Sequence, residues 1–294
     1  MDLKKLIEEQ SLTNFPVGLG GCRTTNSFFD SCEYDITVFD GKSEPTKITF
    51  NDDCFIKIHH GSLKETKSDI LVKYDGMQIL NDESWELRMF LSKIKEKRLI
   101  LYRDFAKNRL FDSLFCCEKT KEGIKNLNAF SSCWQICASY FLADAICSLN
   151  LYRPNPTHML DMLRKFEKNQ INEQISIVTQ TVGIERATQS LLERILKSTI
   201  GFSDLVENNN HSKIIQQKYD LFVKNSMLSD CYFYLGYINK ENFVKIKDKI
   251  DSQPDLIHIL RVAFDIEADS NLLEHQAKLI QKSCNAILSL LSSA

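Results

Sequence analysis

The sequence contains few residues that interrupt regular secondary structure. It has five prolines and ten glycines among 294 residues, and this low content is typical of a largely helical protein. No internal repeat and no low-complexity tract is present, so neither a repeat architecture nor a long linker is indicated.

The ten cysteines include no C-x-x-C pair. This absence argues against a zinc ribbon and against a thioredoxin-type redox motif. The N-terminal segment MDLKKLIEEQ lacks the apolar core of a signal peptide, and it has the pattern of an amphipathic helix with Leu3, Leu6 and Ile7 on one face. We therefore expect a cytoplasmic protein whose thiols are free and mostly buried.

Neither a strong net charge nor a clean membrane span is present. The formal net charge is −2, so the chain as a whole is not a polybasic binder of nucleic acid or membranes. The most apolar stretch, residues 129–149, contains Gln135, Asp144 and four serines. We interpret it as a core helix, and we expect no membrane partner.

The composition that remains is that of an ordinary globular protein. Hydrophobic residues make up 43% of the chain and charged residues 26%, which is enough apolar material for a sizeable core without a metal or disulfide to staple it. A chain of this length forms one large domain or two ordinary ones.

The first 81 residues show short apolar runs separated by turn signals, a pattern typical of a small sheet. The turn signals include Gly20-Gly21, Asp40-Gly41 and Asp75-Gly76. The expected strands are residues 15–19, 34–39, 47–50, 54–59 and 70–74.

After Asn81 the apolar residues recur at spacings of three and four, which predicts helices. We expect a helix start at Asn155-Pro156-Thr157, with Thr157 as a candidate N-cap, and another at Pro254-Asp255. The expected fold class is α+β, with a sheet domain over residues 1–95 and a helical bundle over residues 96–294. The expected helices cover residues 87–94, 99–117, 130–149, 158–166, 175–200, 214–228, 243–250, 256–264 and 272–291.

The segment from residue 15 to residue 40 combines two features that carry chemistry. A strand ends in Gly20-Gly21, and the next strand opens with Glu33 and Asp35. Side chains alternate along a strand, so the two carboxylates project to one face. Carboxylates held close together repel each other unless a cation lies between them, and Mg²⁺ binds through one or two carboxylates plus phosphate oxygens.

The glycine pair supplies the second half of such a site. Glycine lets a backbone approach a phosphate closely, and amides at the start of a helix attract anions. Glycines that can contact phosphates thus lie beside carboxylates that can bind a metal. This combination indicates metal-assisted phosphoryl or nucleotidyl transfer.

This arrangement resembles the nucleotidyltransferase superfamily. Gly20-Gly21 and Glu33-Tyr34-Asp35 match its motif with eleven residues between them, and the layout is similar to the kanamycin-type subgroup, where a helical bundle follows the catalytic domain. The resemblance implies that Glu33 and Asp35 bind Mg²⁺ or Mn²⁺ and that Gly20 and Gly21 contact the β- and γ-phosphates of a nucleoside triphosphate. It places Arg23, Thr25 and Ser27 as further phosphate contacts.

The sequence departs from the family at the third carboxylate, which a later strand normally supplies. The matching strand offers Lys57 or His59. A histidine could act as the base, because its unperturbed pKa is about 6.5, whereas a lysine could occupy a metal position and abolish catalysis. His59 and His60 are adjacent in a strand, so they point to opposite faces. The acids that remain as alternatives are Asp53, Asp69 and Asp75.

Three hypotheses follow. The first is a metal-dependent nucleotidyltransferase that moves a nucleoside monophosphate to a hydroxyl of a small molecule, an RNA or a protein, with Glu33, Asp35 and His59 as catalytic residues. The second is a catalytically inactive module of the same fold that binds a nucleotide or a protein. The third is a helical interaction scaffold with an incidental N-terminal sheet. A homodimer is compatible with each of them.

Overall fold

The computed structural model describes residues 3–51, 54–207, 210–266 and 269–293. The chain divides into two compact units, Met1–Phe105 with Asn209–Ile214, and Ala106–Asn208 with Ile215–Ala294. The expected boundary after residue 95 stays a prediction, because the division between the units falls inside the continuous helix α4 (Arg98–Lys125). A small mixed sheet followed by many helices confirms the α+β class.

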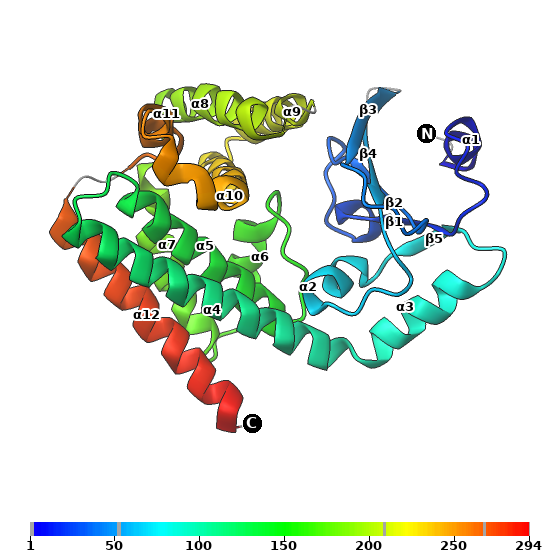
Figure 1. Cartoon of the computed structure of the whole chain (residues 1–294), viewed down its shortest axis with the longest axis horizontal. Coiled ribbons are helices and arrows are strands. Elements are labelled where there is room, and N and C mark those ends of the chain that lie inside the picture. The colour runs from blue at the N-terminus through cyan, green and yellow to red at the C-terminus, as the bar shows by residue number, and fades with distance from the viewer. Residues whose placement is uncertain (1–2, 52–53, 208–209, 267–268, 294) are drawn as a thin grey trace. The chain divides into compact units, whose positions relative to one another are not determined.

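The first unit is built around a five-stranded sheet in the order β3-β4-β2-β1-β5 (Figure 1). β2 and β4 are parallel, and every other neighbouring pair is antiparallel. The strand bounds are β1 Val17–Gly20, β2 Tyr34–Val38, β3 Lys47–Asn51, β4 Cys54–His60 and β5 Gln78–Asn81.

One face of this sheet forms the core of the unit. Helix α1 (Leu3–Glu9) buries Leu6 and Ile7, which confirms the predicted amphipathic helix. These two residues pack with aliphatic side chains from three strands, namely Val17, Leu19, Ile36, Val38, Ile56 and Ile58. Because side chains alternate along a strand, the polar residues between them occupy the opposite face.

The predicted strand over residues 70–74 is wrong. The segment forms helix α2 (Ser68–Leu71) and the 3₁₀ helix η2 (Val72–Tyr74). Its buried residues are Leu71, Val72 and Tyr74. Two of them are adjacent, so buried and exposed side chains do not alternate as they would in a strand with one face in the core. Short apolar runs do not by themselves distinguish a strand from a buried helical turn. The fifth strand is instead β5, a short edge strand that follows a turn at Gly76, where φ is +70°.

The second unit is helical. Its most deeply buried helices are α5 (Ser131–Leu149) and α10 (Leu228–Ile246), and α10 contacts α5, α6, α8 and α11. The remaining helices of the chain are α3 Glu86–Glu96, α6 Met159–Lys165, α7 Ile175–Val182, α8 Gln189–Glu207, α9 His211–Lys224, α11 Leu256–Ala263 and α12 Ser270–Ser293.

Three helix predictions are corrected. The continuous helix over residues 175–200 is broken at Gly183, whose φ of +78° ends α7. The helix expected to begin at residue 243 begins at Leu228. The residues of α10 from Asp230 to Lys240 are all buried, so this part of the sequence lacks the periodicity of an amphipathic helix. Thr157 is not an N-cap, since α6 begins at Met159 after His158.

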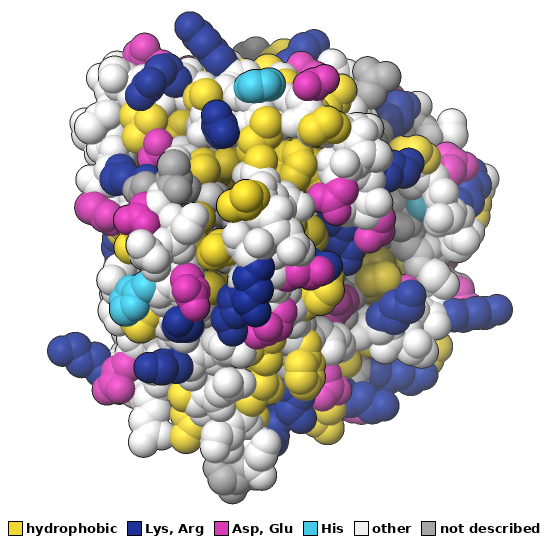
Figure 2. Space-filling view, turned by 60° about the vertical axis from the view of Figure 1, so that its left-hand side comes forward, with side chains coloured by type: hydrophobic (Ala, Val, Ile, Leu, Met, Phe, Trp, Pro, Cys, Tyr) yellow, Lys and Arg dark blue, Asp and Glu magenta, His cyan; other side chains and the backbone are white. Residues whose placement is uncertain are grey.

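The ten cysteines are free and nine of them are buried, which confirms the predicted state of the thiols. Within the described ranges, none of the helices has the length and apolar character that crossing a membrane requires. Basic and acidic side chains are interspersed on the face drawn in Figure 2.

Candidate functional site

The glycine bend lies directly against Asp35. Gly20 ends β1 and is paired with Asp35 of β2. Gly21 has φ +70°, which L side chains rarely adopt, and a Cβ there would overlap Asp35 Oδ2. Glycine is therefore required at residue 21 both for its backbone conformation and for the space that the carboxylate fills. The structure brings together the bend and the carboxylate that the sequence singled out.

One row of residues crosses four strands at this bend. The register pairs Ile48 with Lys57, Lys57 with Asp35, and Asp35 with Gly20. Residues paired across neighbouring strands point to the same face, so the row lies on the polar face opposite the α1 core. Thr37 and His59 form the next row on that face.

Glu33 is held by a lysine on the neighbouring strand. It lies one residue before β2, and its Oε1 is 2.7 Å from Lys57 Nζ. The side chains are 13% and 17% exposed, so water screens the contact only in part. Lys57 thus places an ammonium group beside a carboxylate that the family resemblance assigns to a metal.

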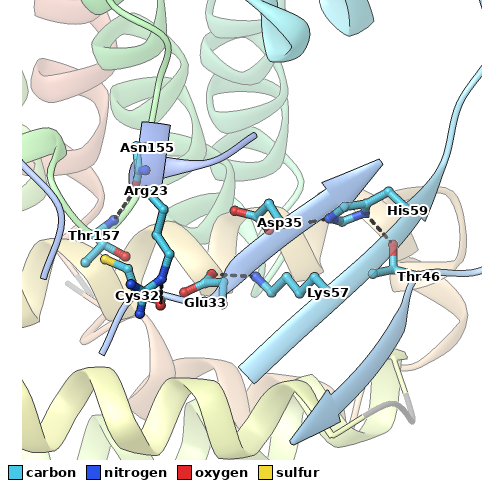
Figure 3. Close-up of polar contacts among 9 residues, drawn as sticks. All are labelled: Arg23, Cys32, Glu33, Asp35, Thr46, Lys57, His59, Asn155 and Thr157. Atoms are coloured by element: carbon cyan, nitrogen blue, oxygen red, sulfur yellow. Dashed lines mark hydrogen bonds and ion pairs between the residues drawn. The ribbon is translucent and has the colours of Figure 1, made fainter. Parts of the chain in front are cut away.

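Asp35 has a histidine as its neighbour from the same strand. His59 Nε2 lies 3.4 Å from Asp35 Oδ1, and His59 Nδ1 is 3.0 Å from Thr46 Oγ1. Figure 3 shows the Glu33–Lys57 and Asp35–His59 contacts running between two neighbouring strands. Thr46 fixes the orientation of the imidazole, so that its other nitrogen faces the carboxylate.

His60 takes part in a different contact. Its Nδ1 lies 2.9 Å from Asp40 Oδ2, away from Asp35. The two adjacent histidines therefore contact different carboxylates, in agreement with the alternation predicted for them.

The strands beside Asp35 carry no third acid, since neither β1 nor β4 contains an acidic residue. Asp75 Oδ2 accepts hydrogen bonds from Arg98 Nε and the Tyr102 hydroxyl, each 2.8 Å long. Burial and the Asp75 charge raise the pKa of Tyr102, which keeps that hydroxyl protonated as a donor. Asp69 lies in the first turn of α2. Asp53 lies outside the described residues.

Arg23 holds the connection between β1 and β2 together. It lies in the 3₁₀ helix η1 (Cys22–Thr24). Its guanidinium donates to the carbonyls of Cys32 (2.7 Å) and Asp30 (2.8 Å) and stacks on Tyr34, 4.0 Å from the ring centroid.

The other predicted phosphate contacts lie in the same connection. Thr25 Oγ1 donates to the Cys22 carbonyl over 2.7 Å, and the exposed Ser27 donates its N–H to Thr25 Oγ1 over 3.4 Å. The phosphate-binding roles of Arg23, Thr25 and Ser27 stay predictions.

Two further residues shape the site, and neither was predicted from the sequence. Met77 packs on the two glycines of β1. A Cβ at Gly18 would overlap its Sδ, and a Cβ at Gly20 would lie 3.5 Å from its Cε. Thr46 orients His59 from the residue before β3. Neither belongs to a motif or a periodic pattern, and only the register of the sheet brings them here.

The donor set fits one Mg²⁺ better than two. Mg²⁺ is commonly bound by one or two carboxylates, with water and phosphate oxygens in the other positions. Asp35 supplies one such carboxylate, while Oε1 of Glu33 is paired with Lys57 Nζ. In the described part of the chain, Glu33, Asp35 and His59 do not bring their ligand atoms within 4.8 Å of one another. The face therefore offers no closed cage, but it suits an ion shared with a phosphate.

Comparison with known proteins adds little to this geometry. No protein-family model and no curated protein matches the chain. A crystal structure of a nucleotidyltransferase-like protein from Exiguobacterium sibiricum is similar at 10% identity and a TM-score of 0.36, over 87% of this chain and 89% of that one.

Proposed function

We propose that the sheet face at Gly20-Gly21 and Asp35 binds a nucleoside triphosphate with Mg²⁺ and does not transfer its nucleotidyl group. The observation that carries this proposal is the Lys57–Glu33 ion pair, 2.7 Å long, next to Asp35. It corresponds to the second hypothesis drawn from the sequence, a catalytically inactive module of the nucleotidyltransferase type.

The charge at the site favours binding over transfer. Two divalent ions that clamp both the attacking and the leaving oxygen are a common device for such displacements. A lysine ammonium supplies one positive charge and no coordination positions, so it can neutralise Glu33 but cannot hold an attacking oxygen. Asp35 then remains to carry a single Mg²⁺, which would neutralise phosphate charge when bound.

The ligand contacts would come from three groups. The backbone at Gly20-Gly21 lies directly against Asp35, so the phosphate oxygens bound to an ion held by Asp35 would come next to it. Asp35 would hold the ion, and His59 lies at its side with 36% of its side chain exposed. A protonated imidazole there would add a second positive group for a phosphate oxygen.

A second candidate function is the metal-dependent transferase, with Mg²⁺ or Mn²⁺ as the cofactor. The contact of His59 with Thr46 favours it, because an oriented imidazole beside a metal-binding carboxylate could accept the proton of an acceptor hydroxyl. The acceptor would be a small molecule, an RNA or a protein.

Calorimetric titration of the full chain with each nucleoside triphosphate, with Mg²⁺ and with EDTA, tests the proposal. We expect Mg²⁺-dependent binding in the natural protein. Asp35→Asn should weaken it at least about tenfold, since the carboxylate that would hold the ion loses its charge. Asp30→Asn removes an exposed carboxylate from the neighbouring connection and should leave binding unchanged. Equal binding in Asp35→Asn and the natural protein would contradict the site.

Pyrophosphate release, measured with and without hydroxyl acceptors, separates the two candidates. Binding without release supports the inactive module. Release that is lost in His59→Asn supports the transferase. An absence of binding to every nucleotide contradicts both and favours the helical scaffold.

A further inference from the structure

An exposed aromatic ring lies on the same sheet face as the proposed phosphate site. The Phe50 side chain is 60% exposed, although phenylalanine is mostly buried in proteins. Phe55 lies behind it, only 7% exposed, with the ring centroids 4.9 Å apart. The buried partner fixes the orientation of Phe50, and the edge strand β3 presents the ring to solvent.

The register places this ring relative to the carboxylates. Phe50 is paired with Phe55, two residues before Lys57 on β4. Glu33 is two residues before Asp35, whose partner is Lys57. Residues two apart in a strand share a face, so Phe50, Phe55, Lys57 and Asp35 all lie on the polar face of the sheet.

The distance from Asp35 to Phe50 suits a nucleotide. Two strand spacings of about 4.8 Å and two residues of about 3.3 Å each separate their backbones, which gives about 12 Å along the diagonal. An extended nucleoside triphosphate spans such a distance between its terminal phosphates and its base. The Lys57–Glu33 pair lies between the two ends, where the sugar would pass.

We propose that Phe50 is the stacking surface for the nucleobase of the triphosphate that Gly20-Gly21 and Asp35 hold. This inference rests on the proposed function, since it assigns the other end of the same ligand. Stacking on an aromatic ring tolerates every base because each has a π-face. Purines should bind more tightly than pyrimidines because they offer more area, and strict selection of one base is not expected.

Inorganic triphosphate separates the two ends of the ligand, because it has phosphates and no base. With Mg²⁺ present, ATP should bind the natural protein roughly tenfold more tightly than inorganic triphosphate does. Phe50→Ala should remove most of that difference by weakening ATP alone, and Phe50→Trp should restore it. Phe111→Ala, which removes a ring that is 59% exposed on α4, is the matched control and should change neither ligand.

The outcomes distinguish this inference from the proposed function. If inorganic triphosphate binds while ATP binds no more tightly, or if Phe50→Ala leaves ATP binding intact, the stacking role is wrong and the phosphate site stands. If neither ligand binds the natural protein, both proposals fail. Urea unfolding of each variant checks that the fold is retained, since Phe50→Ala also removes the ring contact with Phe55.

Discussion

At the residue scale, the polar face of the sheet pairs each carboxylate with a basic side chain from the next strand. Lys57 is paired in register with Asp35, but its ammonium contacts Glu33. His59 is paired in register with Thr37, but its ring contacts Asp35. Each basic side chain thus contacts the carboxylate two residues before its own partner in the register.

A second carboxylate–histidine pair, Asp40 and His60, should make the free energy of unfolding depend on pH. The Asp40 side chain is 3% exposed and contacts His60 Nδ1 over 2.9 Å, while Oδ1 accepts the Lys42 N–H over 3.1 Å. Burial tends to raise the pKa of Asp40, but the hydrogen bonds from the Lys42 backbone and from His60, with the charges of both, lower it below its ordinary value of 3.8.

The sign of the pH dependence follows from that direction. A carboxyl with a lowered folded-state pKa stabilises the fold above its unfolded pKa, and this contribution is lost as the pH falls through the folded-state pKa. Asp40→Asn should lower the free energy of unfolding by about 1–3 kcal/mol at pH 7, and the difference should shrink below pH 3.8. Urea unfolding at pH 7, 5 and 3 measures it, with Asp30→Asn as the exposed control. A difference that stays constant from pH 7 to pH 3 would contradict the assignment.

Part of the site could be predicted from local sequence. Gly20-Gly21 and Asp35 were found because a glycine pair and an alternating acid are both local patterns. Lys57 and His59 could be stated only as alternatives for the position of the third carboxylate, and the contact of Lys57 with Glu33 was not predicted, since it depends on the register of the strand beside β2. Met77 and Thr46 could not be found, because their contacts come from the order and register of strands distant in sequence.

At the scale of elements, glycine conformation decides where α7 ends. Gly183 has φ +78°, its N–H donates to the Thr179 carbonyl over 3.0 Å, and a Cβ there would lie 2.7 Å from Arg186 Nε. A left-handed residue at the C-terminus of a helix is most often glycine. The break after α7 therefore depends on this residue.

Gly183→Ala and Gly201→Ala should have opposite effects on stability. The first forces a side chain into the left-handed region and should destabilise the protein by about 1–2 kcal/mol. The second lies within α8, where a Cβ meets nothing within 4 Å, and it should stabilise by about 0.5–1 kcal/mol. Urea unfolding measures the free energy of unfolding of both variants, and it compares the same substitution in a left-handed and in a helical backbone conformation. A loss of stability in both, or in neither, would contradict the helix break.

The elements were predictable where a local pattern marked them. The strands from β1 to β4 are short apolar runs bounded by turn signals, α5 is a long apolar run, and the amphipathic helices show a period because one face meets water. β5 has only Ile79 and Leu80 as apolar residues at a sheet edge. Most of α10 has no exposed face, so its sequence shows no period to detect.

At the scale of the whole molecule, the helical unit encloses a charged pair in its core. Lys240 Nζ lies 3.0 Å from Asp144 Oδ2, with side chains 6% and 3% exposed, and the Tyr237 hydroxyl donates to Asp144 Oδ1 over 2.7 Å. The ammonium also lies 4.7 Å from the Phe141 ring centroid. Charges in such surroundings persist only when they are paired and hydrogen-bonded.

Removing one partner of this pair should cost far more than removing a surface pair. Lys240→Met leaves Asp144 charged in the core, and it should destabilise the chain by about 3–5 kcal/mol. Adding Asp144→Leu should recover part of that loss. Lys165→Met removes an exposed pair with Asp161, 2.6 Å long, and should change stability by less than about 1 kcal/mol. Calorimetric unfolding of all three variants tests this, and equal losses in the two lysine variants would contradict it.

The burial of most of α10 restricts how this helix can move within the helical unit. Because residues from Asp230 to Lys240 are all buried, α10 has no free side along which it could slide or rotate alone. A displacement of α10 would therefore also require α5, α6, α8 and α11 to move, because all four helices contact it.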